Sequence, residues 1–367
     1  MEKSSENKIY RAIGLMSGTA MDGIDAALIE TDGMDYIKPI GFVTAPHVEK
    51  LRANLKSCLN KTSCDRQIER DFTLAQIPVI QKLLDDNKLL ATDIDIIGFH
   101  GQTIHHDPDN GVTIQIGDGQ LLADEMGIDV VYDFRSHDIK NGGQGAPLLP
   151  IYHQTLVKNS NLALPIAILN LGGVGNITYI DTDNIIAFDT GPANALIDDW
   201  ILTHTGKNYD KNGDTASQGN IDQPIIDAFL SLDYFNKPYP KSLDRNDFKS
   251  ISVDELSLED GTATLTDMTV QSVALSVQQC PARPSHIYVT GGGRHNRFIM
   301  DQIQSSTTIP TSSVDTLNWD GDAMESEGFA YMAVRSLLGH AISFPTTTGC
   351  KHPTTGGVHV STKGHAA

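Results

Sequence analysis

One stretch near the start of the chain, residues 13–29 (IGLMSGTAMDGIDAALI), constrains the fold more than any other. Two short apolar runs are separated by a loop of small residues with an Asp-Gly pair, which predicts a β-hairpin. The loop combines two glycines with four oxygen-bearing side chains, namely Ser17, Thr19, Asp22 and Asp25. Glycine allows a backbone to approach a ligand closely and to point several N–H groups at one anion. By spacing alone, an ordinary turn and an anion-binding loop are equally good interpretations.

The same pattern returns about 155 residues later in the chain. Residues 168–173 (ILNLGG) correspond to residues 13–18 (IGLMSG), and each segment has the pattern of a strand followed by a glycine loop. A return strand and a third strand follow in both places. Such an internal repeat predicts two domains of like topology, with chance similarity of two hairpins as the alternative. Two glycine hairpins facing each other across one cleft would grip a polyphosphate from both sides.

The composition indicates a globular protein that binds neither nucleic acid nor an anionic membrane. The 367 residues suit two domains, and 27 basic against 46 acidic residues give a net charge of −19. That charge repels polyanions, although a local site can still hold a phosphorylated small molecule. No signal peptide and no membrane-spanning run is apparent, so we expect a cytoplasmic protein. Four cysteines without CxxC spacing are predicted to be reduced thiols: Cys58, Cys64, Cys280 and Cys350.

A Gly/Pro-rich segment, NGGQGAPLLP at residues 141–150, is the best candidate for a domain boundary. We therefore expect an N-terminal domain at residues 1–140 and a C-terminal domain at residues 141–344. The polar, turn-rich tail at residues 345–367 is expected to join the N-terminal domain.

Polar residues follow a predicted buried strand in the first domain. The strand at residues 94–99 leads into His100 and Gln102. In open α/β sheets, ligands gather at the carboxyl ends of the strands, so these two side chains are candidates for a binding site. His100 could also bind a metal together with His105 and His106. This alternative is weak because the three histidines lack a helical i, i+4 pair and a fitting carboxylate.

Arg135, Asp189 and Glu325 lie at the ends of other predicted elements. Arg135 follows a strand and is either a surface salt-bridge partner, which the sequence alone favours, or a clamp for an anion or sugar. Asp189 ends a strand and serves either the turn and the next helix start or general base catalysis. Glu325 lies near the start of a predicted helix at residues 322–338. The run Gly291–Gly293, between a strand and a helix, would let the backbone approach a flat or phosphorylated group.

These segments together resemble the anhydro-N-acetylmuramic acid kinase family. The segments that carry the resemblance are LMSGTAMDGIDAAL, GFHGQTIHH, QIGDGQLLADEMGIDVVYDFRSHDIKNGGQGAPLLPIYH, LNLGGVGNIT, FDTGPANALID, TGGGRHN and FPTTTG. They occur in order over nearly the whole chain, and the long segment around Arg135 is highly specific. The family belongs to the sugar kinase/Hsp70/actin-like ATPases. The resemblance therefore implies an α/β fold of two duplicated actin-like (ribonuclease H-like) domains around a central nucleotide and sugar cleft.

The resemblance implies an ATP-dependent kinase that opens the 1,6-anhydro ring of anhydro-N-acetylmuramate with water and phosphorylates O6. The products would be N-acetylmuramate 6-phosphate and ADP, in the recycling of cell-wall peptidoglycan. Carried over by motif, Asp189 would be the catalytic base, and the sugar would be surrounded by His100, Gln102, Arg135 and Glu325. The ATP phosphates would be bound by Gly18, Thr19, Ala20, Met21, Asp22, Gly23, Ile24, Asp25, Gly173 and Gly292. We expect Mg²⁺ to be bound mainly through the phosphates and water.

One residue departs from the family pattern, and other functions stay open. The family loop usually reads GTSMDG, and here Ala20 replaces the serine, which removes a hydroxyl but keeps the backbone donors. The alternatives are a kinase of the same fold for another anhydrosugar or amino sugar and a non-catalytic nucleotide- or sugar-binding protein. A metal-dependent hydrolase built on His100, His105 and His106 is more distant. We expect small-molecule partners, and the sequence leaves monomer and homodimer open.

Overall fold

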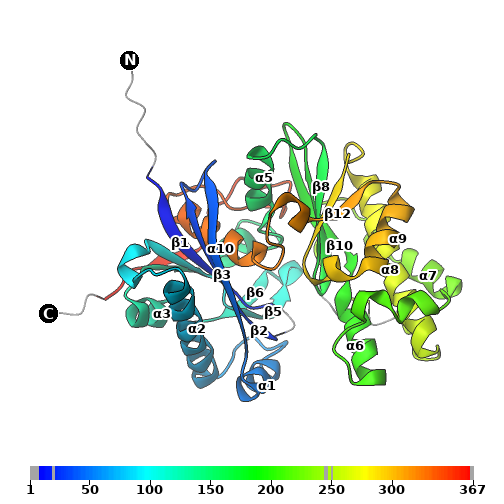
Figure 1. The fold of residues 1–367 in the computed structure, drawn as a ribbon, viewed down its shortest axis with the longest axis horizontal. Helices are drawn as coiled ribbons and strands as arrows, with labels where there is room; N and C mark the ends of the chain where they lie inside the picture. Colours follow the sequence, from blue (N-terminus) through cyan, green and yellow to red (C-terminus); the bar gives the residue numbers. More distant parts are fainter. Residues whose placement is uncertain (1–7, 19–20, 244–246, 249–250, 364–367) are drawn as a thin grey trace. The chain divides into compact units, whose positions relative to one another are not determined.

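The computed structural model describes the chain in four stretches, residues 8–18, 21–243, 247–248 and 251–363 (Figure 1). The chain divides into two compact units. Unit 1 extends to Asn161 and resumes at Ala323, and unit 2 comprises Leu162–Asp322. Each unit has an α/β architecture with its own apolar core.

The boundaries between the units differ from the predicted ones. The Gly/Pro-rich segment at residues 141–150 lies inside unit 1, and the chain passes between the units at 161/162 and 322/323 instead. The glycines of this segment serve packing. A Cβ on Gly143 would lie 2.2 Å from a carboxylate oxygen of Asp138, so a side chain at this position would displace the carboxylate. Glycine is common both in domain linkers and where backbone packs closely against other groups. The Gly/Pro-rich sequence here therefore indicates a tightly packed loop and not a linker.

Unit 1 is built on a six-stranded mixed sheet. In spatial order its strands are β13 (Val358–Val360), β7 (Val130–Tyr132), β4 (Ile96–Phe99), β1 (Tyr10–Met16), β2 (Gly23–Thr31) and β3 (Ile37–Pro46). β1, β2 and β3 are antiparallel neighbours, which confirms the predicted hairpin. β4 pairs parallel to β1, and β7 pairs parallel to β4. β4 is buried along its whole length, and for this reason its sequence is a continuous apolar run.

Unit 2 repeats this topology in a five-stranded sheet. In spatial order its strands are β10 (Ile185–Pro192), β9 (Val174–Ile180), β8 (Ile166–Leu171), β11 (Ile287–Thr290) and β12 (Thr311–Ser313). β8, β9 and β10 are antiparallel neighbours, and β11 and β12 continue the sheet in parallel. The order β10-β9-β8-β11-β12 matches β3-β2-β1-β4-β7 of unit 1. The internal repeat is therefore confirmed, and the fold is a duplicated actin-like, ribonuclease H-like one.

Helices and one further hairpin complete the units. In unit 1 these are α1 (Glu49–Ser57), α2 (Arg66–Asp86), the hairpin β5 (Gln102–Asp107) with β6 (Val112–Ile116), α3 (Gly119–Met126), α4 (Ser136–Lys140), α5 (Pro150–Lys158) and α10 (Met324–Leu337). In unit 2 they are α6 (Asn194–Thr205), α7 (Gln223–Leu230), α8 (Leu258–Gln279) and α9 (Arg297–Thr307).

Helix α10 lies directly against the central strands of unit 1. Gly14 on β1 and Gly98 on β4 are partners in the parallel register. A Cβ on Gly14 would lie 1.8 Å from the carbonyl oxygen of Ser326, and one on Gly98 would lie 2.2 Å from that of Phe329. Two adjacent glycines thus open a place for the helix backbone that no other residue type would leave. The chain therefore rejoins unit 1 at Ala323, earlier than the predicted tail.

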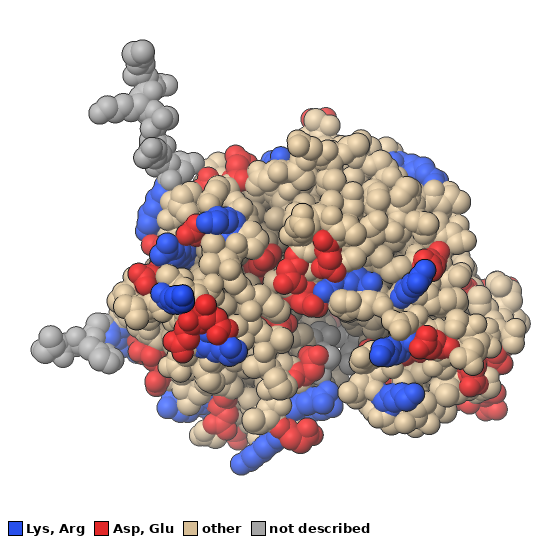
Figure 2. All heavy atoms as spheres, in the orientation of Figure 1, with Lys and Arg blue, Asp and Glu red and all other residues tan. Residues whose placement is uncertain are grey.

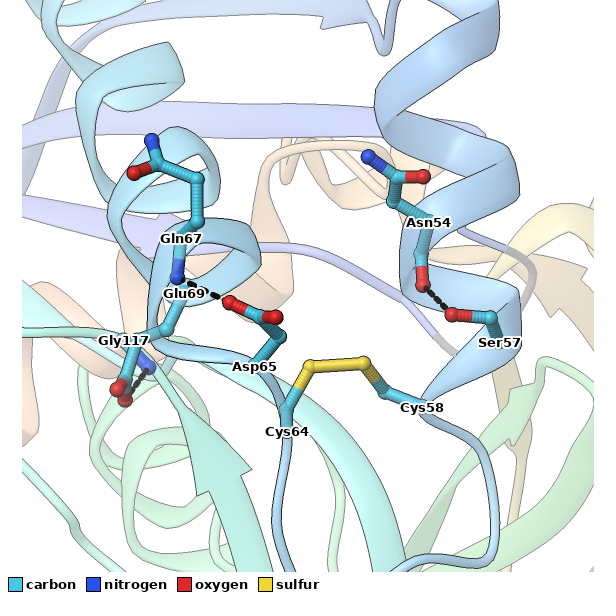
Figure 3. The surroundings of a disulfide bond; sticks show 8 residues. All are labelled: Asn54, Ser57, Cys58, Cys64, Asp65, Gln67, Glu69 and Gly117. Carbon is cyan, nitrogen blue, oxygen red and sulfur yellow. Dashed lines mark hydrogen bonds between the residues drawn. A yellow bond between two sulfur atoms is a disulfide. The ribbon is translucent and has the colours of Figure 1, made fainter.

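Cys58 and Cys64 form a disulfide, which corrects the prediction of four reduced thiols (Figure 3). Cys58 follows the last turn of α1, and Cys64 precedes Asp65, the N-cap of α2 whose side chain accepts a hydrogen bond from the Gln67 N–H. The bridge therefore joins the end of one helix to the start of the next. The six-residue spacing carries no sequence signature, and only the turn between the helices brings the sulfurs together. Cys280 and Cys350 are free thiols.

We predict that the disulfide stabilises unit 1 by lowering the conformational entropy of the unfolded chain. For so short a loop the entropic contribution is about 2 kcal/mol, so replacing both cysteines by serine should lower the melting temperature by roughly 4–8 °C. The measurement is thermal unfolding with and without reductant. Reductant should lower the melting temperature of the wild type and leave that of the double variant unchanged. Equal melting temperatures for all four samples would contradict the prediction.

Candidate active site

The β1–β2 turn of unit 1 is anchored on both sides of its tip. The Met21 N–H donates to the Gly18 carbonyl oxygen at 3.1 Å, which closes a tight turn. Met21 has a left-handed backbone (φ 52°), and its side chain is buried in the core of unit 1. Thr19 and Ala20, at the tip, lie outside the described residues. The turn thus has the fixed ends that a loop presenting N–H groups to an anion requires.

The remaining predicted residues of this turn are arranged along the start of β2. Ile24 is buried in the core, whereas Asp22 is exposed and Gly23 and Asp25 are half-buried. Asp22 and Asp25 are the carboxylates that β2 and its turn bring closest to the tip in sequence. Oxygen donors of this type suit Mg²⁺, which prefers carboxylates, phosphates and water.

Gln102 is bonded to the β1–β2 turn. Its side chain is fully buried, and its Nε2 donates to the carbonyl oxygens of Gly18 at 3.2 Å and Thr103 at 3.3 Å. Its Oε1 accepts a hydrogen bond from the Ser17 hydroxyl at 2.8 Å. Both ends of the amide are therefore engaged within the protein. This geometry connects Gln102 to the loop backbone.

His100 and Arg135 form a hydrogen-bonded pair at the carboxyl ends of β4 and β7. The Arg135 Nε–H donates to His100 Nε2 at 3.0 Å, and His100 Nδ1 lies 2.8 Å from the Gly101 carbonyl oxygen. We assign the proton of a neutral ring to Nδ1, because Nε2 must accept from the guanidinium. Burial, and then the positive charge of Arg135, hold the pKa of His100 well below its usual range. The pair therefore carries one positive charge, on Arg135.

A buried carboxylate, Asp138, fixes the loop that Arg135 contacts. The Arg135 Nη1 group donates to the Gly145 carbonyl oxygen at 2.6 Å, and the Gly145 N–H donates to Asp138 Oδ2 at 2.7 Å. Asp138 Oδ1 accepts from the hydroxyls of Ser343 at 2.5 Å and Thr348 at 2.7 Å. The sequence analysis missed Asp138. The only hint in the sequence was that residue 138 and residues 343–348 lie in or next to two segments that resemble the family. The Asp138 carboxylate connects these two segments.

Glu325 lies in the first turn of α10, in the same unit as His100 and Arg135. Phe329, one helical turn later, packs its ring 4.5 Å from the ring of His100. Residues four apart on a helix share a face, so Glu325 and Phe329 project from the same side of α10. Glu325 itself is half-buried, one helical turn before the residue that packs on His100.

In unit 2, Asp189 lies on β10 and is bonded by the segment that follows α7. It is 7% exposed, and its Oδ2 accepts from the Leu243 N–H at 2.8 Å. Its own N–H donates to the Lys241 carbonyl oxygen at 2.9 Å, and its carbonyl oxygen accepts from the Tyr234 hydroxyl. Burial, and then the charge of Asp189, raise the pKa of Tyr234. Three contacts to one loop therefore fix both the backbone and the carboxylate of Asp189.

Lys241, whose backbone carbonyl oxygen accepts the hydrogen bond from the Asp189 N–H, has a buried side chain that the sequence analysis missed. Its side chain is 5% exposed, its Nζ donates to the Tyr234 carbonyl oxygen at 3.2 Å, and it lies 4.6 Å from the centre of the Tyr234 ring. Burial, and then the charge of Lys237, lower its pKa to about 8. No local pattern announces this contact, because Lys241 lies in an irregular loop more than 50 residues from Asp189 in sequence.

The predicted glycine loops of unit 2 meet at the start of α6. The carbonyl oxygen of Gly173 accepts from the N–H groups of Ala193 at 3.1 Å and Ala195 at 3.3 Å. Gly292 follows the left-handed Gly291 after β11, and a Cβ on Gly292 would lie 3.8 Å from the side-chain nitrogen of Asn194. Asn194 Nδ2 also donates to the Leu171 carbonyl oxygen at 2.8 Å. The loops at Gly173 and Gly292 thus both lie against the first residues of α6.

Arg294 fixes the conformation of the glycine run after β11. Its side chain is 3% exposed, and it forms ion pairs with Asp315 at 3.0 Å and Asp322 at 2.8 Å. Its Nη1 also donates to the Gly291 carbonyl oxygen at 3.0 Å. A cation held by two carboxylates therefore sets the loop backbone. The sequence analysis quoted this arginine within TGGGRHN but gave it no role.

His105 and His106, considered above as metal ligands, lie on β5. His106 Nδ1 contacts the Thr113 hydroxyl at 3.0 Å. Within the part of the chain that the structure describes, no group of three or more His, Cys, Asp or Glu side chains is arranged to hold a metal ion.

No helix in the described stretches is long and apolar enough to cross a membrane. Figure 2 shows basic side chains interspersed with acidic ones on the visible face.

Two ribonuclease H-like units, each with a glycine turn between its first two strands, define an actin-like ATPase architecture. A family model described as anhydro-N-acetylmuramic acid kinase matches residues 10–362. The chain belongs to the anhydro-N-acetylmuramic acid kinase family. The match spans every candidate site residue of both units.

Curated relatives carry the same family name. The relative from Rhizorhabdus wittichii is 49% identical over 358 residues, which cover 95% of this chain and 98% of the relative. The relative from Zymomonas mobilis is 48% identical, with coverage of 94% and 98%. The relative from Paramagnetospirillum magneticum is 46% identical, with coverage of 95% and 99%.

Among solved structures, the activator of the 2-hydroxyisocaproyl-CoA dehydratase from Clostridium difficile with bound ADPNP is 12% identical. It has a TM-score of 0.44, with coverage of 89% of this chain and 96% of that one.

We predict that the buried Lys241 makes stability depend on pH. Its folded pKa of about 8 lies below the usual 10.5, so between these values the unfolded chain binds more protons and stability rises with pH. The cost of burying the charge is fully present below pH 8. Lys241→Met should therefore melt higher than the wild type near pH 7, and this advantage should shrink toward pH 10. Melting temperatures across that range provide the measurement. A constant difference, or the same trend in the exposed control Lys207→Met, would contradict the prediction.

Proposed function

We propose that the protein is an ATP-dependent kinase that opens the 1,6-anhydro ring of anhydro-N-acetylmuramic acid with water and phosphorylates O6. The products are N-acetylmuramate 6-phosphate and ADP, and the reaction serves the recycling of cell-wall peptidoglycan. The observation that carries the proposal is the family match over residues 10–362. It is supported by relatives of that name at 46–49% identity over nearly the whole chain.

Asp189 is the proposed general base. Water is a poor nucleophile, and a carboxylate that accepts its proton helps as C1 of the sugar gains positive character. The C1–O6 bond breaks, and O6 takes the γ-phosphoryl group, so that the leaving oxygen of one step is the nucleophile of the next. The hydrogen bond from Leu243 to Oδ2 supports this role, because it fixes the orientation of the carboxylate.

The proposed sugar-binding residues, His100, Arg135 and Glu325, all belong to unit 1. Arg135 is a cation whose Nε and Nη1 groups are fixed by His100 and Gly145. A guanidinium fixed in this way suits a carboxylate or a pair of hydroxyl groups. Glu325 would accept hydrogen bonds from sugar hydroxyls. For Gln102 we now propose an indirect role through the loop, since its amide is fully buried.

The proposed phosphate-binding groups are backbone N–H donors of glycine loops. They comprise the β1–β2 turn from Gly18 to Asp25 and the loops at Gly173 and Gly292. Phosphoryl transfer depends mainly on positioning and on neutralising charge, which such donors supply. Mg²⁺, held mainly by phosphates and water with Asp22 and Asp25 as nearby oxygen donors, would neutralise further negative charge.

We also propose that the protein acts in the cytoplasm, where ATP is available, and handles only small molecules. The net charge of −19 supports the absence of nucleic acid as a partner. A disulfide between Cys58 and Cys64 is unusual for a cytoplasmic protein, because the cytoplasm keeps most thiols reduced.

The purified protein should turn over ATP only when an anhydro amino sugar is present. ADP release is measured with anhydro-N-acetylmuramic acid, with N-acetylmuramic acid as the open-ring control, and without sugar. EDTA should stop the reaction, and added Mg²⁺ should restore it. ATP turnover that is independent of sugar, or restoration by Zn²⁺ but not Mg²⁺, would contradict the kinase assignment.

Asp189→Asn should lower kcat by about 10²–10⁴-fold, because it preserves shape and removes only basicity. ATP binding, measured by calorimetry, should stay close to that of the wild type. Asp183→Asn, in the exposed turn between β9 and β10, is the matched control and should retain full activity. A loss of less than tenfold in Asp189→Asn would remove this residue from the role of general base.

A further inference from the structure

His47 contacts the β1–β2 turn from the end of β3. It is 8% exposed, and its Nε2 lies 3.1 Å from the hydroxyl oxygen of Ser17, which is itself 3% exposed. The His47 backbone N–H donates to the Asp22 carbonyl oxygen at 2.9 Å. The sequence analysis gave His47 no role, because β3 and the turn come together only through strand pairing. One residue thus contacts both sides of the proposed phosphate loop.

The number of available protons determines the direction of these hydrogen bonds. The Ser17 hydroxyl has one proton and two oxygen acceptors in reach, Gln102 Oε1 at 2.8 Å and the Gly23 carbonyl oxygen at 2.9 Å. We assign the ring proton of His47 to Nε2, so that Nε2–H donates to the Ser17 oxygen at 3.1 Å and the single hydroxyl proton is left for these acceptors. His47 is therefore the donor that orients the Ser17 hydroxyl toward the other two groups.

The environment of His47 favours a neutral ring. Its ring packs 5.9 Å from the ring of Phe72 on α2, and the charged groups that face it are Asp22 on the turn and Arg52 on α1. Burial lowers the pKa of His47, and Arg52 acts in the same direction against the opposing effect of Asp22. Nδ1 is buried and has no hydrogen-bond partner among the described residues. The ring is thus positioned through Nε2.

The hydrogen bonds form a continuous path from His47 to the loop backbone. The Ser17 hydroxyl donates to Gln102 Oε1, and the Gln102 amide nitrogen donates to the Gly18 carbonyl oxygen at 3.2 Å. On the other side of the tip, Ser17 contacts the Gly23 carbonyl oxygen. The backbone at residues 17, 18, 22 and 23 is therefore fixed by one buried polar group. Such fixation sets where the loop N–H groups point.

We propose that His47 is a positioning residue for ATP, acting through the Ser17 hydroxyl to hold the phosphate-binding loop. The inference rests on the proposed function, in which this loop binds the ATP phosphates. His47 itself touches neither ATP nor sugar. Its contribution therefore requires Ser17, and removing either side chain should have the same effect on nucleotide use.

A double-mutant cycle tests this dependence. We expect His47→Leu and Ser17→Ala each to lower kcat/KM for ATP by about 10- to 100-fold, because small displacements of positioning groups are costly in phosphoryl transfer. The double variant should be no more than about twofold worse than either single variant, since coupled residues are not additive. His47→Leu keeps the backbone bond to Asp22, so the cycle isolates the ring.

Two further variants separate positioning from stability. His47→Gln places an amide N–H near the position of Nε2 and should restore kcat/KM to within about threefold of the wild type. Thr155→Val removes a buried hydrogen bond to Tyr331 at 2.9 Å, in the same unit, where Thr155 also contacts Met34 in the β2–β3 turn. That turn lies at the opposite end of β2 from the phosphate loop. Thr155→Val should lower the melting temperature while leaving kcat/KM for ATP unchanged.

The possible outcomes distinguish this inference from the proposed function. If the wild type shows no sugar-dependent ATP turnover, the kinase proposal fails. If the wild type is active but His47→Leu changes kcat/KM no more than Thr155→Val does, the positioning role is overturned. Losses that multiply in the double variant, or no rescue by His47→Gln, would also overturn it.

Discussion

The close packing of α10 on β1 and β4 is the contact on which unit 1 depends. Gly14 and Gly98 lie side by side in the sheet, and the helix backbone occupies the space that their side chains would fill. This packing brings the chain back from unit 2 and places Phe329 against His100. Glu325 lies in the first turn of the same helix. A proposed sugar site is therefore assembled from residues more than 200 positions apart, because two glycines permit one helix to lie flat on the sheet.

Each proposed functional loop is fixed by one buried polar side chain. Asp138 binds the N–H of Gly145 in the loop that contacts Arg135, and Arg294 binds the carbonyl oxygen of Gly291. Gln102 does the same for Gly18 in the β1–β2 turn. A buried polar group is costly when unpaired, so each loop is locked in the one conformation that satisfies its group. These hydrogen bonds restrict glycine-rich backbones that would otherwise be flexible.

Charge is distributed so that one cation remains where an anion would bind. His100 is neutral beside Arg135, since a second positive charge in that buried pair would be unfavourable. In unit 2, burial lowers the pKa of Lys241, whose backbone carbonyl oxygen accepts the hydrogen bond from the Asp189 N–H. The balance between burial and charge therefore differs at the two proposed sites, although the sheets that carry them have the same topology.

The sequence by itself determined the two sheets, the glycine turns and the family, because apolar runs, turn residues and motifs are local properties of the chain. It placed Glu325 at a helix start, whereas Asp189, predicted to end a strand, lies inside β10, which continues past a β-bulge to Pro192. Only the tertiary structure decided which residues surround them. The disulfide between Cys58 and Cys64, the unit boundary at residues 161/162 and the contact of Lys241 with the Asp189 loop have no periodic signature. They arise from the packing of segments whose meeting depends on the whole fold.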